Sequence, residues 1–132
     1  FDRTLAQRLP LRILLVEDNL LNQKVAQQTL VRLGYQIDIA ANGLEALNAL
    51  EQTRYDVVLM DVQMPEMDGL ETSRRICAQW SPDNSPYIVA MTAHALTGDY
   101  EDCLAAGMHD YVSKPFQLEK LVAALVRSQL YT

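Results

Sequence analysis

One apolar run that ends abruptly in an acid constrains the fold of this chain more than any other stretch. Val57 to Met60 are four consecutive apolar residues, two of them β-branched, and Asp61 follows them directly. Such a run is typical of a parallel strand that is covered on both faces, and Pro65 and Asp68-Gly69 are turn residues that end it. Asp61 is therefore predicted at the carboxyl end of a buried strand, the edge where open parallel sheets bind ligands.

Short apolar strands and amphipathic helices alternate along the rest of the chain. Strands are predicted at Ile13–Val16, Gln36–Ala40, Val57–Met60, Tyr87–Met91 and Asp110–Ser113. Helices are predicted from about Leu20 to Leu33, after Asn42-Gly43, from Gly69 to about Trp80, from about Ala95 to Ala106, and from Leu118 onward. Five strand–helix units in this order predict a doubly wound α/β domain.

Apolar residues at helical spacing mark the helix faces that we expect to cover the sheet. They are Leu21, Val25, Ala26, Leu30 and Leu33 in the first helix, Leu44, Leu47 and Leu50 in the second, and Leu118, Leu121, Val122 and Leu125, with Gln129 on the same stripe, in the last. Asn19 is a suitable cap for the first helix, and Gly34 and Gly107 are suitable ends for the first and fourth.

The length and apolar content predict a single domain. With 132 residues, of which 49% are hydrophobic, the chain can bury a core without a disulfide or a structural metal. Residues 1–11 are polar with scattered apolar positions and include Pro10, so we expect a linker or a frayed helical end there, and the folded domain at residues 12–131. Because the chain begins at Phe1 and not at Met, we expect it to be a piece of a longer protein.

The charge and the cysteines limit the possible partners. A net charge of -6 and a pI near 4.7 argue against nucleic acid or an anionic membrane surface as a direct partner, and favour proteins or cations. Cys77 and Cys103 lack the spacing of metal ligands, and the sequence shows neither a signal peptide nor a membrane-spanning run. We therefore expect a cytoplasmic setting, in which both cysteines are small buried residues.

The predicted strand ends share a chemistry. Glu17 and Asp18 follow the first strand, Asp61 the third, Thr92 the fourth and Lys114 the fifth. Three carboxylates in one crevice repel one another, and a hard divalent cation with oxygen ligands would neutralise them. Mg²⁺ fits best, because it accepts two carboxylates plus waters and shares its remaining positions with phosphate oxygens. Asp61 could then attack phosphorus to form an aspartyl phosphate, with Lys114 and Thr92 on the phosphoryl oxygens and no general base.

Four stretches together resemble the receiver domains of bacterial two-component response regulators, over nearly the whole chain. They are Val16-Glu17-Asp18-Asn19, the run from Leu59 through Asp61 and Pro65 to Gly69, Met91-Thr92-Ala93, and Asp110-Tyr111-Val112-Ser113-Lys114-Pro115-Phe116. The resemblance implies a flavodoxin-like doubly wound (βα)5 three-layer sandwich with a parallel sheet of order 2-1-3-4-5. It also implies that residues 12–131 are the receiver domain.

The resemblance also implies a role for each site residue. Asp61 would take a phosphoryl group from a partner's phosphohistidine, with Lys114 and Thr92 assisting. Asp18, Asp61 and the Gln63 backbone carbonyl would bind Mg²⁺, with Glu17 acting through water. Thr92 and Tyr111 match the family's switch pair. The domain would catalyse its own phosphorylation and dephosphorylation, as a monomer or weak dimer, with a histidine kinase domain or a histidine phosphotransfer domain as its partner.

A narrower likeness is to the receivers of hybrid sensor histidine kinases. It is carried by the stretch from Asn19 to Ala26, by Thr92-Ala93-His94-Ala95 with Gly98-Asp99, and by Cys103-Leu104-Ala105-Ala106-Gly107-Met108. It implies a parent hybrid kinase and leaves open a tether to the membrane through that parent, and also whether the domain relays phosphate or modulates the kinase. Tyr100 and His109 depart from the common pattern. We expect His109 on the surface and His94 in a loop, either over the site or in solvent.

Other readings of the same residues remain open. A haloacid-dehalogenase-like phosphatase also uses a strand-end aspartate with Mg²⁺, but it would want a second aspartate where Gln63 stands. A flavodoxin-like cofactor binder shares the sheet order, but Glu17 and Asp18 would repel a phosphate from the first loop. A protein-interaction domain with an inactive site is disfavoured, because every reactive position is filled.

Overall fold

Five parallel strands form one sheet in the order β2-β1-β3-β4-β5, in a computed structural model that describes residues 5–62, 64, 67–81, 83–92, 97–113 and 117–130. The strands are β1 (Ile13–Val16), β2 (Ile37–Ala40), β3 (Val57–Asp61), β4 (Tyr87–Thr92) and β5 (Asp110–Ser113). The helices are α1 (Leu5–Arg8), α2 (Leu20–Arg32), α3 (Gly43–Gln52), α4 (Gly69–Gln79), α5 (Thr97–Ala105) and α6 (Leu118–Leu130). The predicted fold class and sheet order are confirmed.

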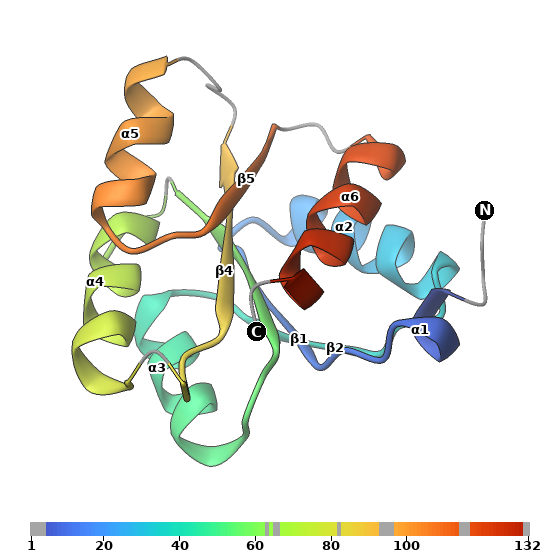
Figure 1. Ribbon diagram of the computed structural model, residues 1–132, viewed down its shortest axis with the longest axis horizontal. Coiled ribbons are helices and arrows are strands. Elements are labelled where there is room, and N and C mark those ends of the chain that lie inside the picture. The colour runs from blue at the N-terminus through green and yellow to red at the C-terminus, as the bar shows by residue number, and fades with distance from the viewer. Residues whose placement is uncertain are drawn as a thin grey trace.

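Helices cover both faces of the sheet and make three layers (Figure 1). Helices α1, α2 and α6 lie on one face, where Leu30 and Leu121 pack against Ile13, Leu15 and other apolar residues of that face. Helices α3, α4 and α5 lie on the other, where Ala46 and Ile76 join a second apolar cluster. The sheet separates the two halves of the core.

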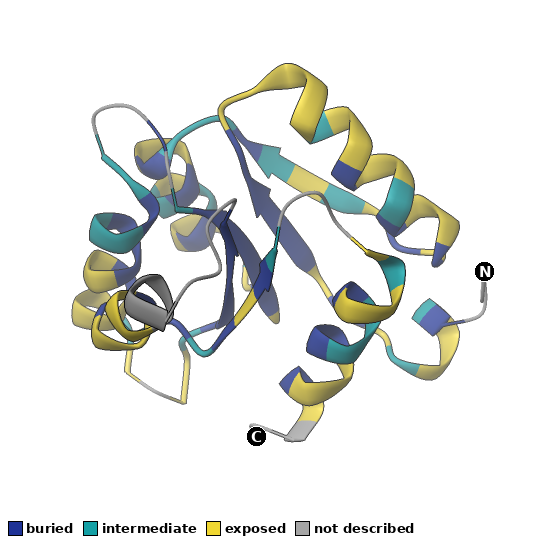
Figure 2. Ribbon diagram, turned by 90° about the horizontal axis from the view of Figure 1, so that it is seen from above, coloured by how far each residue is buried: buried dark blue, intermediate teal, exposed yellow. Residues whose placement is uncertain are grey.

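The inner strands are buried along their whole length, and the helices carry the exposed surface (Figure 2). Strand β2 lies at one edge, and its Asp38 is exposed between two partly buried isoleucines. This contrast explains why β1 and β3 read as continuous apolar runs, whereas β2 alternates.

Side-chain caps and glycines set the helix ends, as the sequence predicts. The Asn19 and Asn42 side chains accept hydrogen bonds from the backbone N–H groups of Asn22 and Glu45, at the starts of α2 and α3. Gly34 and Gly107, after α2 and α5, have φ angles of 96° and 92°, a left-handed conformation that glycine adopts without strain.

Part of the predicted packing face of two helices is wrong. Leu21 and Val25 of α2 are exposed, as is Leu44 of α3. Helix α2 packs through Ala26, Leu30 and Leu33, and successive residues lie about 100° apart around a helix, so Val25 points away from that stripe. Helical spacing alone predicted a wider apolar stripe on each of these helices than the part that packs against the sheet.

Residues 5–11 pack against the domain, unlike the linker expected for residues 1–11. Leu5 and Leu11 belong to the core cluster on the α2 face. The Ala6 N–H donates to the Leu33 carbonyl (3.1 Å), and the Tyr35 hydroxyl donates to the Leu9 carbonyl (2.6 Å). The expected helical end is present as α1, and these contacts fix it against the end of α2.

A partly buried ion pair joins β5 to α6, with Asp110 buried and Arg127 exposed. The Asp110 carboxylate accepts hydrogen bonds from Nε and Nη2 of Arg127, at 2.6 and 2.9 Å, and from the Tyr87 hydroxyl at 3.1 Å. Burial and the nearby Asp110 charge raise the pKa of Tyr87 to about 12. The hydrogen bond to Asp110 raises the pKa of Arg127 above its usual value.

His109 is half-buried beside this pair, and the expectation of a surface histidine is wrong. The backbone N–H of His109 donates to the Ile88 carbonyl (2.8 Å), and the ring nitrogen Nδ1 accepts a hydrogen bond from the Ile88 backbone N–H (3.0 Å). The imidazole stacks on Tyr87, with ring centroids 5.0 Å apart. These two hydrogen bonds extend the pairing of β4 with β5 by one residue. Because Nδ1 is an acceptor, the bond to it requires a neutral ring with an unprotonated Nδ1.

We expect His109 to make stability depend on pH. Burial lowers the pKa of His109 below its usual 6.5, although the Asp110 charge acts in the opposite direction. The unfolded chain therefore takes up this proton at a higher pH than the folded domain does. The contribution of neutral His109 to the free energy of unfolding is therefore complete above about pH 6.5, and it falls as the pH drops below that value.

Urea unfolding between about pH 5 and pH 7.5 measures this effect in the wild type and in His109→Asn, which keeps an acceptor but cannot titrate. The wild type should lose more unfolding free energy on acidification than the variant does. Carboxylates titrate in both proteins, so the difference isolates His109. Parallel pH profiles would contradict the assigned protonation state.

Candidate functional site

The register of the strands brings the predicted acids to one edge of the sheet. Val16 pairs with Met60, and Asp61 pairs with Met91. Glu17 is one residue beyond Val16, as Asp61 is beyond Met60, so the two acids lie at the same level along the sheet. Because all five strands are parallel, this carboxyl edge is where a doubly wound sheet binds its ligand.

Three carboxylates converge at this edge. Glu17, Asp18 and Asp61 each offer one oxygen, and these oxygens all lie within 4.8 Å of one another. Glu17 and Asp61 are buried, at 1% and 4% exposed, whereas Asp18 is exposed. Hard oxygen donors at this spacing fit a divalent cation with oxygen ligands, which would offset both the repulsion and the burial of the two inner acids.

Gly69 sets the backbone around Asp61. Its N–H donates to the Val62 carbonyl (3.0 Å), which closes the loop after β3. A β-carbon at Gly69 would collide with the Asp61 carbonyl oxygen and would lie 2.9 Å from the Val62 Cα. Both neighbours are backbone atoms, which cannot rotate away. The sequence identified Asp68-Gly69 as turn residues that end the strand, but only the structure shows that Gly69 lies against the backbone of Asp61.

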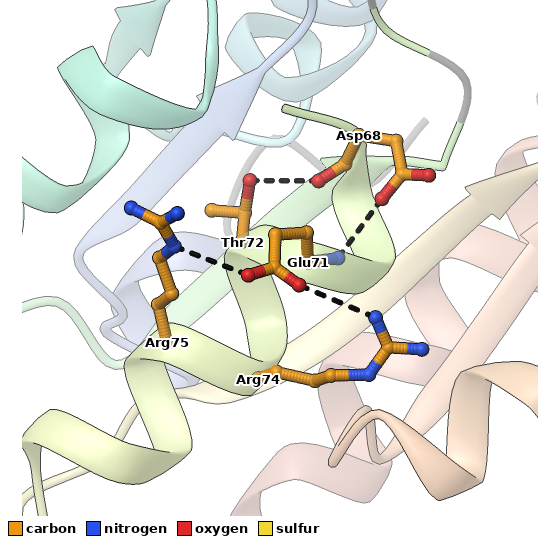
Figure 3. Close-up of polar contacts among 5 residues, drawn as sticks. All are labelled: Asp68, Glu71, Thr72, Arg74 and Arg75. Atoms are coloured by element: carbon orange, nitrogen blue, oxygen red, sulfur yellow. Dashed lines mark hydrogen bonds and ion pairs between the residues drawn. The ribbon is translucent and has the colours of Figure 1, made fainter. Parts of the chain in front are cut away.

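The start of α4 is fixed next to this contact (Figure 3). The Asp68 carboxylate accepts from the Glu71 N–H (2.9 Å), and the Thr72 hydroxyl donates to the Asp68 carbonyl (2.8 Å). Glu71 pairs with Arg74 and Arg75 on the exposed side of the helix. The cap holds the first turn, and with it Gly69, against the end of β3.

The predicted switch residues lie on neighbouring strands. Thr92 is buried at the end of β4, and Tyr111 is 37% exposed on β5. Tyr111 pairs with Ala90, two residues before Thr92, so the two side chains lie on the same face of the sheet. Gln63, His94 and Lys114 lie outside the described residues, so the assignments made for them remain predictions.

The sequence profile described as "Response regulator receiver domain" matches residues 13–126. The chain belongs to this family. Membership is consistent with a phosphoacceptor role in a two-component phosphorelay, and it supports neither the dehalogenase-like nor the flavodoxin-like alternative.

Similar receivers occur within hybrid kinases. The chain is 42% identical to part of "Hybrid signal transduction histidine kinase H" of Dictyostelium discoideum, over 93% of this chain and 9% of that protein. It is 41% identical to part of the Escherichia coli aerobic respiration control sensor protein ArcB, over 87% of this chain and 15% of that protein. This receiver domain thus spans only a small part of the curated relatives it matches.

A solved structure shows the same fold with a metal. The receiver domain of the sensor histidine kinase PA1611 from Pseudomonas aeruginosa PAO1 is 45% identical, with a TM-score of 0.79, covering 89% of this chain and 95% of that one. That structure holds a magnesium ion coordinated in its active site cleft. In the present receiver, none of the helices among the described residues is long and apolar enough to cross a membrane.

Proposed function

We propose that this receiver domain accepts a phosphoryl group on Asp61. One observation carries the proposal: Asp61 ends a buried central strand, and one of its oxygens lies within 4.8 Å of oxygens from two further carboxylates. An ionised carboxylate is a nucleophile without the help of a general base. One oxygen of Asp61 would form a bond to phosphorus while the bond from phosphorus to the donor's imidazole nitrogen breaks. The electron pair of that bond stays on the nitrogen, and with a proton on the other ring nitrogen the donor leaves as a neutral histidine.

Mg²⁺ is the cation that we propose for this cluster. Asp18 and Asp61 would bind it directly, together with the Gln63 carbonyl, and Glu17 would act through a water molecule. When bound, the cation neutralises the carboxylates and the charge of the transferring group. The convergent oxygens of this chain and the magnesium in the PA1611 receiver support this choice.

The remaining site residues bind the group that is transferred. The Thr92 hydroxyl, at the end of the strand next to β3, would donate to one phosphoryl oxygen. Lys114 would pair with Asp61 before the reaction and with the phosphoryl group after it. This catalysis consists of positioning and charge neutralisation, and the same residues would serve autodephosphorylation by water.

The proposed partner is a protein that carries a phosphohistidine, either a histidine kinase domain or a histidine phosphotransfer domain. The similarity to hybrid kinase receivers supports a parent of that kind, in which the domain would relay phosphate or modulate its own kinase. The net charge of -6 disfavours nucleic acid or an anionic membrane surface as a partner. Cys77 and Cys103 form no disulfide with each other, which supports the cytoplasmic setting that we propose. Cys103 is buried, as expected, but the expectation is wrong for Cys77, which is exposed.

Labelling with a small phosphodonor tests the acceptor. Acetyl phosphate is added to the domain with Mg²⁺ or with excess chelator, and intact mass is followed over time. We expect a gain of one phosphoryl group with Mg²⁺, little without it, and none in Asp61→Asn, because only the carboxylate can attack phosphorus. Asp102→Asn, an exposed acid on α5, controls for the loss of one negative charge and should label normally.

Undiminished labelling of Asp61→Asn would place the acceptor elsewhere. Equal labelling with chelator would remove the metal from the proposed reaction.

We propose that phosphorylation is read out through Thr92 and Tyr111. If Thr92 turns to donate a hydrogen bond to the phosphoryl group, space opens beside the small Ala90 side chain, with which Tyr111 pairs. Tyr111 could then move inward and alter the surface of α5, β5 and α6. The phosphoryl group shifts this equilibrium only if it binds the inward state more tightly.

NMR spectra of the wild type and Thr92→Ala, each with and without the phosphoryl mimic beryllofluoride, test this coupling. Resonances around Tyr111 should shift in the wild type and much less in Thr92→Ala. Equal shifts in both proteins would show that Tyr111 responds independently of Thr92.

A further inference from the structure

Gln23 reaches back from α2 to the loop that carries two of the acids. Its side-chain Nε2 donates a hydrogen bond of 2.7 Å to the Glu17 carbonyl oxygen, in a partly buried position. The carbonyl belongs to the peptide that joins Glu17 to Asp18. This hydrogen bond therefore restricts the orientation of the peptide plane between Glu17 and Asp18.

Other contacts hold the loop on either side of that peptide. The Glu17 N–H donates to the carbonyl of Ala40, the last residue of β2 (3.0 Å). Asn19 is held at the start of α2, where its side chain accepts from the Asn22 N–H and its carbonyl from the Gln23 N–H. Gln23 thus completes a frame in which the backbone before and after Asp18 is fixed.

The two acids depend on this frame to different degrees. Glu17 is buried, so the surrounding core restricts its side chain. Asp18 is exposed, so packing restricts its carboxylate less, and the position of its backbone decides where its oxygens lie. A contact that fixes the Glu17–Asp18 peptide therefore acts mainly on Asp18.

We propose that Gln23 is a positioning residue for the cation ligands, and that its hydrogen bond to Glu17 favours Mg²⁺ over larger cations. The inference rests on the proposed function, since it assumes that the carboxylate cluster binds a divalent cation. Mg²⁺ requires near-octahedral geometry with short bonds, whereas Ca²⁺ accepts longer bonds and variable geometry. A looser loop should therefore cost Mg²⁺ more than it costs Ca²⁺.

Calorimetric titration of the metal-free domain with MgCl₂ and with CaCl₂ measures this selectivity. Gln23→Met removes the donor with little change in size and none in charge, so the Coulomb attraction of the site is preserved. Gln28→Met makes the same replacement at an exposed position of the same helix and is the matched control. Circular dichroism and thermal unfolding without metal show that each variant is folded under the conditions used.

We expect Gln23→Met to bind Mg²⁺ about 3- to 10-fold more weakly, as the loss of one hydrogen bond implies, and Ca²⁺ with a smaller change. Gln28→Met should match the wild type for both ions. Unchanged Mg²⁺ affinity in Gln23→Met would overturn the inference. An equal loss for both ions would also overturn it, because Gln23 would then support the site without setting its geometry.

Hydrogen exchange in the wild type gives a second test that needs no variant. NMR should show slower exchange for the side-chain amide of Gln23 than for that of Gln28, with or without metal. Equal exchange rates would show that the bond is not maintained in solution. A wild type that binds neither ion would instead overturn the proposed metal site itself, so the two failures can be told apart.

Discussion

The parallel register of β1, β3 and β4 is the constraint on which the site depends. Because Val16 is level with Met60, and Asp61 is level with Met91, the residues at the carboxyl ends of these strands meet at one edge of the sheet. A shift of one residue in any of these pairings would reverse the faces of a buried strand and separate the acids. The apolar core that fixes the register therefore also fixes the spacing of the carboxylates.

Repulsion within the cluster has to be balanced by contacts that do not depend on the acids' own charge. Glu17 is held through its backbone by Ala40 and Gln23, and Asp61 by the close approach of Gly69. Two of the three carboxylates, Glu17 and Asp61, are also buried, so the fold holds them away from solvent as well as close together. In the function that we propose, this cluster binds a cation, and the cation helps to bind the phosphoryl group.

Much of this could be predicted from the sequence, because strand-end acids, apolar runs and turn residues are local signals. The five strands and the convergence of Glu17, Asp18 and Asp61 were of this kind, whereas the sheet order was implied by the resemblance to receiver domains. Local signals do not show which side of a helix the sheet covers, and so the exposed Leu21 and Leu44 were expected inside. The backbone contacts of Gln23 and His109 depend on how a loop or a neighbouring strand is placed, which composition and spacing do not reveal.

A crystal structure of the domain with Mg²⁺ and beryllofluoride tests the central claim most directly. The account predicts a beryllium–oxygen bond on the Asp61 carboxylate, and one magnesium ion that contacts oxygens of Asp18 and Asp61, with a water molecule between it and Glu17. A fluoride adduct on any other side chain, or a metal ion bound away from these three carboxylates, would contradict it.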